Sequence, residues 1–250
     1  MTATRPLRSP FAAIVTYAAR ITVGGRRWIV LVAALLVAGF GFGLLAHAVD
    51  EPTDEAFAAI ATGTLFALVV PLGSLVVGDG VLGAEIRSGT FQLTWLAPVP
   101  VRAIVLGRWL AGALLAAATL AVSLALSAVV AGSAVNAGPA AAAGAAAGAT
   151  YVAVFVLVGA VTSRAALWSL VLIYLVEQLL GAVLSGVAQF SPQWLGRAML
   201  GDLGTGTEDL LRDGVPSGFA ALFRLALMTV VCLALATWRL RHYTPSGGRD

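Results

Sequence analysis

The chain alternates long apolar runs with short polar connections. Six of these runs are close to the roughly 20 residues that a helix needs to cross the hydrocarbon of a bilayer. They cover residues 28–49, 56–78, 106–132, 140–162, 165–187 and 219–238. Uninterrupted apolar runs do not alternate as the strands of a membrane barrel do, so each run predicts a transmembrane helix. The expected fold is an all-α integral membrane protein with six transmembrane helices.

A different pattern precedes the first run, within residues 1–27. After Pro10, apolar side chains recur at helical spacing, at Phe11, Ile14, Val15, Ala18 and Ile21. Five arginines accompany them. One apolar face beside basic residues is typical of a helix that lies in the membrane interface. The alternative is a plain basic tail; we favour the interfacial helix.

The composition supports a membrane protein. The chain is 60% hydrophobic and 11% charged, whereas soluble domains carry about 25% charged residues. We expect a single transmembrane domain over residues 1–250, with an interfacial part at 1–27, a membrane part at 28–238 and a tail at 239–250. The net charge of +3 is scattered at the ends of the apolar runs, so no nucleic-acid partner is expected.

The arginines predict the orientation. Twelve of the fifteen fall in residues 1–27, in the segment after the second run, at Arg164 and after the sixth run; the opposite side has Arg197 and Arg212. Basic residues concentrate on the cytoplasmic side of membrane proteins. Both termini and the segment 79–109 are therefore expected in the cytoplasm, in a multi-pass protein of the cell membrane.

The residue inventory excludes several kinds of chemistry. The chain has no lysine, and a phosphate-binding P-loop requires one. Cys232 is the single cysteine, and His47 and His242 are far apart in sequence, so neither a disulfide nor a metal cluster is expected. No nucleophile–base constellation of an intramembrane enzyme is evident. We expect no catalytic residues, no metal and no cofactor in this chain.

Polar residues inside the predicted helices are the next candidates. Glu177 and Gln178 lie in the fifth run and Arg224 lies in the sixth. Each charge costs about 2.5–3.5 kcal/mol near the centre of a helix if it is alone. Three interpretations remain open at this point: an intramembrane ion pair between Glu177 and Arg224, a polar lining of a substrate path, or a proton-coupling acid at Glu177.

Small residues and a proline predict packing and bending. Gly39 with Gly43, and Gly144 with Gly148, are small residues four apart that let helices approach closely. Pro71 interrupts the second run and predicts a kink. The last outer connection, 188–218, mixes apolar and charged residues and is expected to form short helices that turn back toward the membrane.

The segment between the second and third runs carries the most specific signal. It contains Glu85, Arg87, Gly89-Thr90, Phe91, Trp95, Pro98, Arg102, Gly107 and Arg108. We expect a short amphipathic coupling helix, then a break, since both Pro98 and Pro100 stop a helix. This order resembles the ABC-2 type permeases, the membrane subunits of ATP-binding-cassette exporters. Family members commonly carry lysine at the position of Arg108, and Ser-Arg after the proline where this chain has Val-Pro-Val-Arg.

The resemblance extends over the whole predicted topology and implies a mechanism. A separate ATPase, two copies per complex, would dock on the coupling helix, and the ATPase itself would bind ATP and Mg²⁺. A second permease subunit, identical or related, would complete the dimer. Glu85, Arg87 and Arg102 would make charged contacts to the ATPase, and Phe91 and Trp95 would anchor in its groove, with Gly89, Thr90 and Pro98 shaping the segment.

The resemblance also places the substrate path between two subunits, near the first, second and fifth helices. Phe40, Phe42, Tyr174, Glu177 and Gln178 are the candidate lining residues, although Phe40 and Phe42 cannot face the same side of one helix. The expected function is export of an amphipathic molecule, such as a drug or antibiotic in multidrug efflux, a lipid or a glycolipid. The alternative is a stand-alone proton-coupled carrier that uses Glu177.

Overall fold

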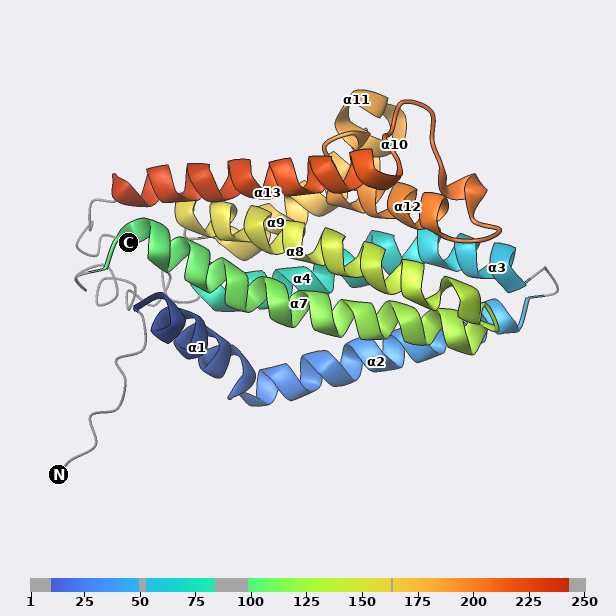
Figure 1. Ribbon diagram of the computed structural model, residues 1–250, viewed down its shortest axis with the longest axis horizontal. Coiled ribbons are helices and arrows are strands. Elements are labelled where there is room, and N and C mark those ends of the chain that lie inside the picture. The colour runs from blue at the N-terminus through green and yellow to red at the C-terminus, as the bar shows by residue number, and fades with distance from the viewer. Residues whose placement is uncertain (1–9, 50–52, 84–98, 163, 243–250) are drawn as a thin grey trace.

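The chain is an all-helical membrane protein, with no strand in the part of the chain that the structure describes. The computed structural model describes residues 10–49, 53–83, 99–162 and 164–242, without the side chains of Pro10, Gly83 and Asp209. Six long apolar helices run roughly side by side (Figure 1). We number them span 1 to span 6: Arg26–His47, Thr53–Leu82, Val101–Ala131, Ala134–Val161, Ala165–Val183 and Gly218–Arg241.

The individual elements follow the spans in order. Helix α1 (Pro10–Val23) precedes span 1, which is α2 (Arg26–His47). Span 2 consists of α3 (Thr53–Ile60), the π-helix η1 (Ala61–Val69), α4 (Val70–Gly78) and the π-helix η2 (Asp79–Gly83). Span 3 is α7 (Val101–Ala131), and span 4 joins η3 (Ala134–Asn136) to α8 (Ala137–Val161). Span 5 is α9 (Ala165–Val171), the π-helix η4 (Leu172–Leu180) and α10 (Gly181–Val183), followed by α11 (Ser185–Ala188), α12 (Pro192–Leu203), η5 (Glu208–Leu210) and span 6, α13 (Gly218–Arg241).

The six predicted runs are confirmed as helices, with boundaries that differ in two useful places. Span 2 continues past residue 78 to Leu82, and span 3 begins at Val101 rather than at 106. Within the segment 79–109, residues 79–82 therefore belong to span 2 and residues 101–109 belong to span 3. Pro100 is the residue before α7. Proline suits this position because its backbone nitrogen has no hydrogen to donate.

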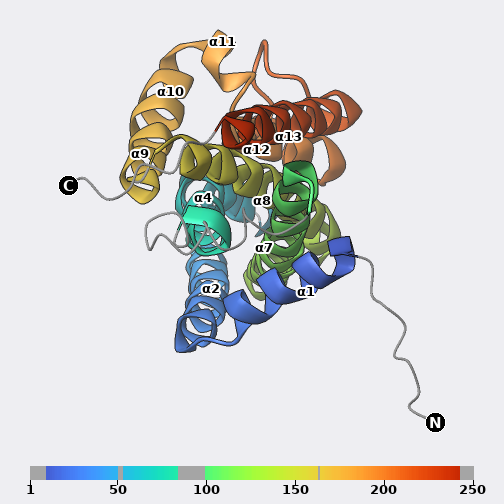
Figure 2. The ribbon, with the colours of Figure 1, turned by 90° about the vertical axis from the view of Figure 1, so that its left-hand side faces the viewer.

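Span 4 forms the centre of the bundle. Figure 2 shows α8 surrounded by α4, α7, α12 and α13, and the largest buried side chains include Tyr151 and Phe155 of this helix. Its first half is nearly all alanine and glycine, so neighbouring helices can approach it closely. A Cβ at Gly148 would lie 2.6 Å from a methyl of Leu120 on span 3.

Span 1 packs against span 3 through its own small residues. Gly39 and Gly43 are both buried, and they lie against the backbone of span 3 at Ser123 and Ser127. The Ser123 hydroxyl donates a hydrogen bond to the Leu35 carbonyl at 2.6 Å. This close approach confirms the role predicted for the Gly39–Gly43 pair within one subunit.

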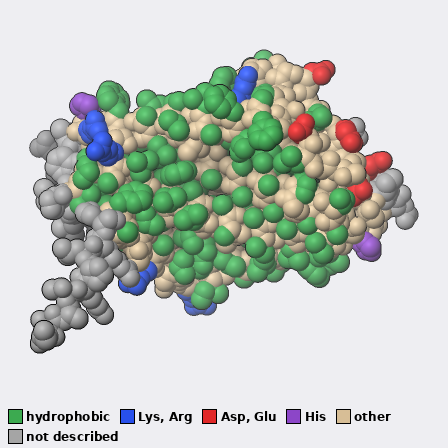
Figure 3. Space-filling model, viewed as in Figure 1, with side chains coloured by type: hydrophobic (Ala, Val, Ile, Leu, Met, Phe, Trp, Pro, Cys, Tyr) green, Lys and Arg blue, Asp and Glu red, His purple; other side chains and the backbone are tan. Residues whose placement is uncertain are grey.

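The two ends of the bundle differ in charge. Arginines gather at the end that holds α1, and acidic residues gather at the opposite end (Figure 3). We call them the basic end and the acidic end. At the acidic end, Asn136 is buried and its amide donates to the Thr205 carbonyl at 2.9 Å, while Ser133 donates to Asp54 at 2.5 Å. These bonds tie the connection between spans 3 and 4 to the start of span 2 and to the loop after α12.

The packing predicts opposite outcomes for substitutions of Gly41 and Gly43, which are two residues apart in span 1. A Cβ at Gly43 would lie 2.7 Å from the Ser127 carbonyl oxygen, whereas a Cβ at Gly41 meets nothing within 4 Å. Gly43→Ala should destabilise the protein by about 1–3 kcal/mol through overpacking. A lower thermal midpoint in detergent would show it.

Gly41→Ala is the matched control, since it makes the same change on the exposed face of the same helix. Its thermal midpoint should stay at or above that of the unsubstituted protein. Equal midpoints for the two variants would contradict the packing of span 1 on span 3.

Candidate functional site

The residues expected to receive an ATPase lie mostly outside the described part of the chain. Seven of them fall in residues 84–98, which the structure does not describe: Glu85, Arg87, Gly89, Thr90, Phe91, Trp95 and Pro98. Arg102 is described, and it is exposed in the first turn of α7 at the basic end. What the structure describes in detail is how the two helices that flank this segment are joined.

A buried arginine joins spans 2 and 3 at that end. Arg108 is 2% exposed, and one of its guanidinium nitrogens donates to the Val81 carbonyl at 2.8 Å. A Cβ at Gly112, one turn further along span 3, would meet Val81 at 2.9 Å. Val81 belongs to η2, so the polar contact and the close packing hold the last turn of span 2 against span 3. We call this contact the basic-end joint.

Helix α1 reaches the same joint from the other side of span 3. Gly107 lies against Ile14, whose Cγ2 would be 2.9 Å from an added Cβ, and against Phe11. Helix α1 packs against α7. The position of α1 therefore sets where the chain enters span 1, which begins three residues after α1 ends.

Span 2 changes from a π-helix to an α-helix beside Pro71, where a kink was predicted. Pro71 stands in the first turn of α4, directly after the π-helix η1. In an α-helix the N–H of residue 71 would bond to the Ala67 carbonyl, and proline has no N–H. The side-chain amide of Gln178, on span 5, donates to that carbonyl at 2.7 Å. Gln178 therefore supplies the donor that Pro71 lacks and joins span 5 to span 2.

Span 5 contains the π-helix η4. Two side chains from the segment after span 5, Trp194 of α12 and Arg212, donate hydrogen bonds to backbone carbonyls in η4 and α10. The Trp194 indole N–H donates to the Glu177 carbonyl at 3.4 Å. Arg212 donates to the carbonyls of Gly181 and Ala182 at 2.7 and 2.9 Å. The guanidinium of Arg212 also stacks over the Trp194 ring, 4.7 Å from its centroid. These contacts hold the end of span 5 to the segment after it.

Glu177 is buried, and it lies between span 4 and α12. The Tyr151 hydroxyl of α8 donates to its carboxylate, and Arg197 of α12 is the neighbouring cation. Arg197 lies outside the six spans. Burial lowers the pKa of Arg197 to about 10, while Tyr151 and Glu177 act in the opposite direction. Arg197 is therefore charged at neutral pH, and its positive charge interacts electrostatically with Glu177.

The predicted ion pair between Glu177 and Arg224 is wrong. Arg224 donates to the side-chain oxygen of Gln189 at 2.8 Å, and Glu177 bonds to Tyr151 instead. The sequence argument compared only depth along two neighbouring spans. The structure brings α12 against α8 and α13, and α12 supplies Arg197 as a nearer cation for Glu177.

The candidate lining residues separate onto different surfaces. Phe40 and Tyr174 are exposed, while Phe42 packs on the core. Glu177 lines a different space, a cavity of about 460 Å³ between spans 4, 5 and 6, whose other lining is almost wholly apolar. Gln178 bonds to span 2, as described above. The five residues therefore do not line one common path within a single subunit.

Sequence reasoning missed several residues that organise this region, among them Tyr151, Gln193, Trp194 and Arg197. Gln193 is fully buried and donates to Gln178 at 3.3 Å. The signal was a set of polar residues beside Pro192, in the connection where short helices were expected. The short helices expected within residues 188–218 are confirmed as α12 and η5. The contacts of Gln193, Trp194 and Arg197 with spans 4 and 5 could not be read from the spacing of residues, because they form only when distant segments pack together.

Comparison with known proteins finds no protein family that matches this chain and no curated protein that matches it.

The pairing of Gln178 with the carbonyl freed by Pro71 predicts a specific rescue. Gln178→Leu should leave the Ala67 carbonyl without this donor and destabilise the protein by about 1 kcal/mol. Pro71→Ala restores a backbone N–H in span 2. In that background, Gln178→Leu should cost much less, and the thermal midpoints of the four proteins measure the coupling.

Tyr174→Phe is the control for this cycle, because Tyr174 is an exposed polar residue on the same π-helix. It should leave the midpoint unchanged in both backgrounds. An equal loss from Gln178→Leu with proline and with alanine at residue 71 would contradict the proposed bond.

Proposed function

We propose that this chain is the membrane-spanning permease subunit of an ATP-driven exporter of the ABC-2 type. The observation that supports the proposal most is the basic-end joint. Arg108 and Val81 fasten together the two spans between which residues 84–98 are inserted. A protein that pushes on this segment would therefore move spans 2 and 3 as one body instead of bending one of them.

The contacts described above suggest a route for that movement. Span 2 is bonded to span 5 through Gln178, and span 5 is bonded through Trp194 and Arg212 to the segment after it. A displacement at the basic end would reach the acidic end through spans 2 and 5. Packed elements with hydrogen bonds between them carry such displacements. In this proposal, two copies of a separate ATPase bind ATP and Mg²⁺, and their closure provides the push.

The positive-inside rule supplies the orientation of this proposal. The basic end holds Arg20, Arg26, Arg27, Arg102, Arg239 and Arg241, and we assign it to the cytoplasm. The segment 84–98 then faces the compartment that contains ATP. The chain would be a multi-pass protein of the cell membrane.

A second permease subunit completes the proposed machine. Figure 2 shows α2, α4 and α9 following one another along one side of the bundle. Exposed side chains on this side include Val37 and Phe40 of α2, Val76 of α4, and Tyr174 of η4, which continues α9. We place the second subunit, identical or related, on this side, with an amphipathic substrate such as a drug, a lipid or a glycolipid moving between the two subunits.

The alternative function is a stand-alone carrier in which Glu177 binds the coupling proton. Its burial beside Tyr151 favours a carboxyl group with a special role. The electrostatic interaction with Arg197 gives the same acid a structural purpose. The two functions differ in the partner: the carrier needs a proton gradient and no ATPase, whereas the permease subunit needs an ATPase bound to residues 84–98.

Co-purification separates the two functions. The chain, extracted from its native membrane in mild detergent, should retain a soluble P-loop ATPase at equal stoichiometry. Glu85→Arg should lower the retention about tenfold, because reversing one charge at a docking surface costs about 1.4 kcal/mol or more.

Glu208→Arg is the matched control, since it reverses an exposed acid at the opposite end of the bundle. Its retention of the ATPase should be unchanged, and both variants should keep the same thermal midpoint. Purification of an active transporter without any ATPase would overturn the proposed function.

A further inference from the structure

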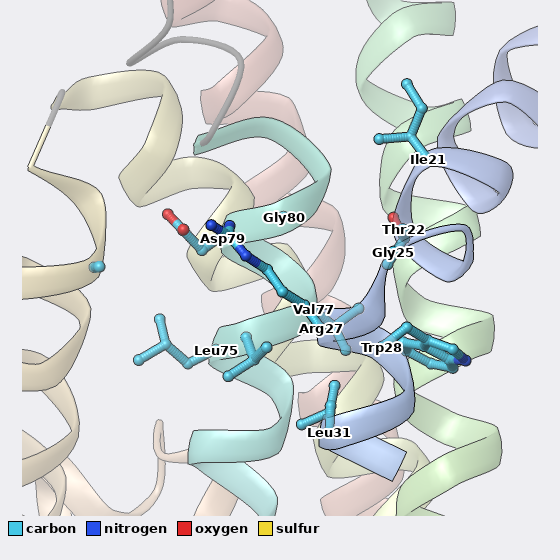
Figure 4. Close-up of a pocket in the computed structure, with 12 residues that line it drawn as sticks. Ile21, Thr22, Gly25, Arg27, Trp28, Leu31, Leu75, Val77, Asp79 and Gly80 are labelled. Atoms are coloured by element: carbon cyan, nitrogen blue, oxygen red, sulfur yellow. The ribbon is translucent and has the colours of Figure 1, made fainter.

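A cleft opens at the basic end between the turn from α1 to α2 and the end of span 2 (Figure 4). Its volume is about 400 Å³. Most of its lining is apolar and includes Ile21, Trp28, Leu31 and Val77. Its polar side chains are Thr22, Arg27 and Asp79. The cleft therefore has an apolar body with charged groups at one level.

A second cavity continues from the first along span 1. It has a volume of about 650 Å³ and shares Arg27, Leu31 and Val76 with the cleft. Arg26 is its second charged residue, and Val30 and Ala34 extend it along the helix. Together the two cavities form one groove that begins between arginines and runs between spans 1 and 2 over apolar side chains.

The charges of this groove favour an anion. Arg26 and Arg27 are both exposed, whereas Asp79 is half-buried. Figure 4 shows the Arg27 side chain extending across the cleft toward the end of span 2 that carries Asp79. With two arginines and one aspartate, the lining keeps a net positive charge. Arginine forks bind phosphate groups with particularly suitable geometry.

The apolar continuation distinguishes a lipid from a free anion. Inorganic phosphate would use the arginines and leave the apolar groove beside spans 1 and 2 without a function. A phospholipid has a phosphate at the level of the charged groups and acyl chains that extend along the helices. Trp28 lies at the same level as the arginines, as aromatic residues do at the boundary between head groups and hydrocarbon.

We propose that this groove binds one anionic phospholipid from the leaflet at the basic end. Its phosphate lies between Arg26 and Arg27, and one acyl chain follows the groove past Leu31 to Ala34. Basic pockets between transmembrane helices recognise anionic head groups in this way. All groups that the site needs belong to one chain, and the inference does not depend on an ATPase. Val76 also lies on the side where we place the second subunit, so the groove would border that interface.

Native mass spectrometry of the purified chain in detergent tests the site. Titration with phosphatidylglycerol should give one tightly retained lipid, whereas phosphatidylcholine with the same acyl chains should be retained much less. Arg26→Gln should weaken retention of phosphatidylglycerol about 5-fold, and Arg26→Gln with Arg27→Gln about 25-fold. Glycerol phosphate, which has the head group without the chains, should not compete.

Arg241→Gln is the charge-matched control, because it removes an exposed arginine at the same end of the bundle but on span 6. It should leave retention unchanged. Equal losses for Arg241→Gln and Arg26→Gln would overturn the proposal, since they would show general attraction to a basic surface. Competition by glycerol phosphate would also overturn it, in favour of a free-anion site.

A second pair of variants tests the groove without changing any charge. Ala33 and Ala34 are both exposed on span 1, and only Ala34 lines the cavity. Ala34→Phe should fill the groove and abolish retention of the lipid, while Ala33→Phe should leave it intact. Unchanged retention in Ala34→Phe would place the lipid elsewhere and contradict the inference.

Discussion

Backbone groups inside a membrane need hydrogen-bond partners, and the carbonyl of Ala67, which accepts a hydrogen bond from span 5, shows how this requirement connects the spans. Pro71 removes the N–H that would normally reach this carbonyl. In the hydrocarbon of a bilayer no water replaces it, and the loss of an interhelical hydrogen bond there costs about 1 kcal/mol. The amide of Gln178 fills the place from span 5. This bond helps to hold span 5 beside span 2.

In each π-helix of the described residues, one backbone carbonyl accepts a hydrogen bond from a side chain of another helix. Val81 of η2 receives Arg108, Ala67 of η1 receives Gln178, and the Glu177 carbonyl of η4 receives the Trp194 indole. A π-helix widens the backbone and often marks a functional position. Here each widened segment is bonded to a different neighbour. The polar residues of the membrane part therefore act first as connections between helices.

The sequence was sufficient for the fold class, the six spans and the contact of Gly39 and Gly43, because these depend on length, apolarity and small residues. It also identified Pro71, Glu177, Gln178 and Arg224 as unusual. It did not identify their partners, since Gln178 and Ala67 are 111 residues apart. The ion pair of Glu177 with Arg224 was wrong because α12, whose contacts with spans 4 and 5 the sequence did not show, places Arg197 near Glu177.

Our account of function depends on residues 84–98 facing the cytoplasm, and side-specific labelling of one thiol measures this directly. Cys232 is the chain's single cysteine, so replacing it with serine gives a background for one new thiol at residue 88. The account predicts that Ser88→Cys reacts with a membrane-impermeant maleimide in inside-out vesicles and not in intact cells, while Glu208→Cys shows the reverse. Labelling of Ser88→Cys from outside intact cells would contradict it.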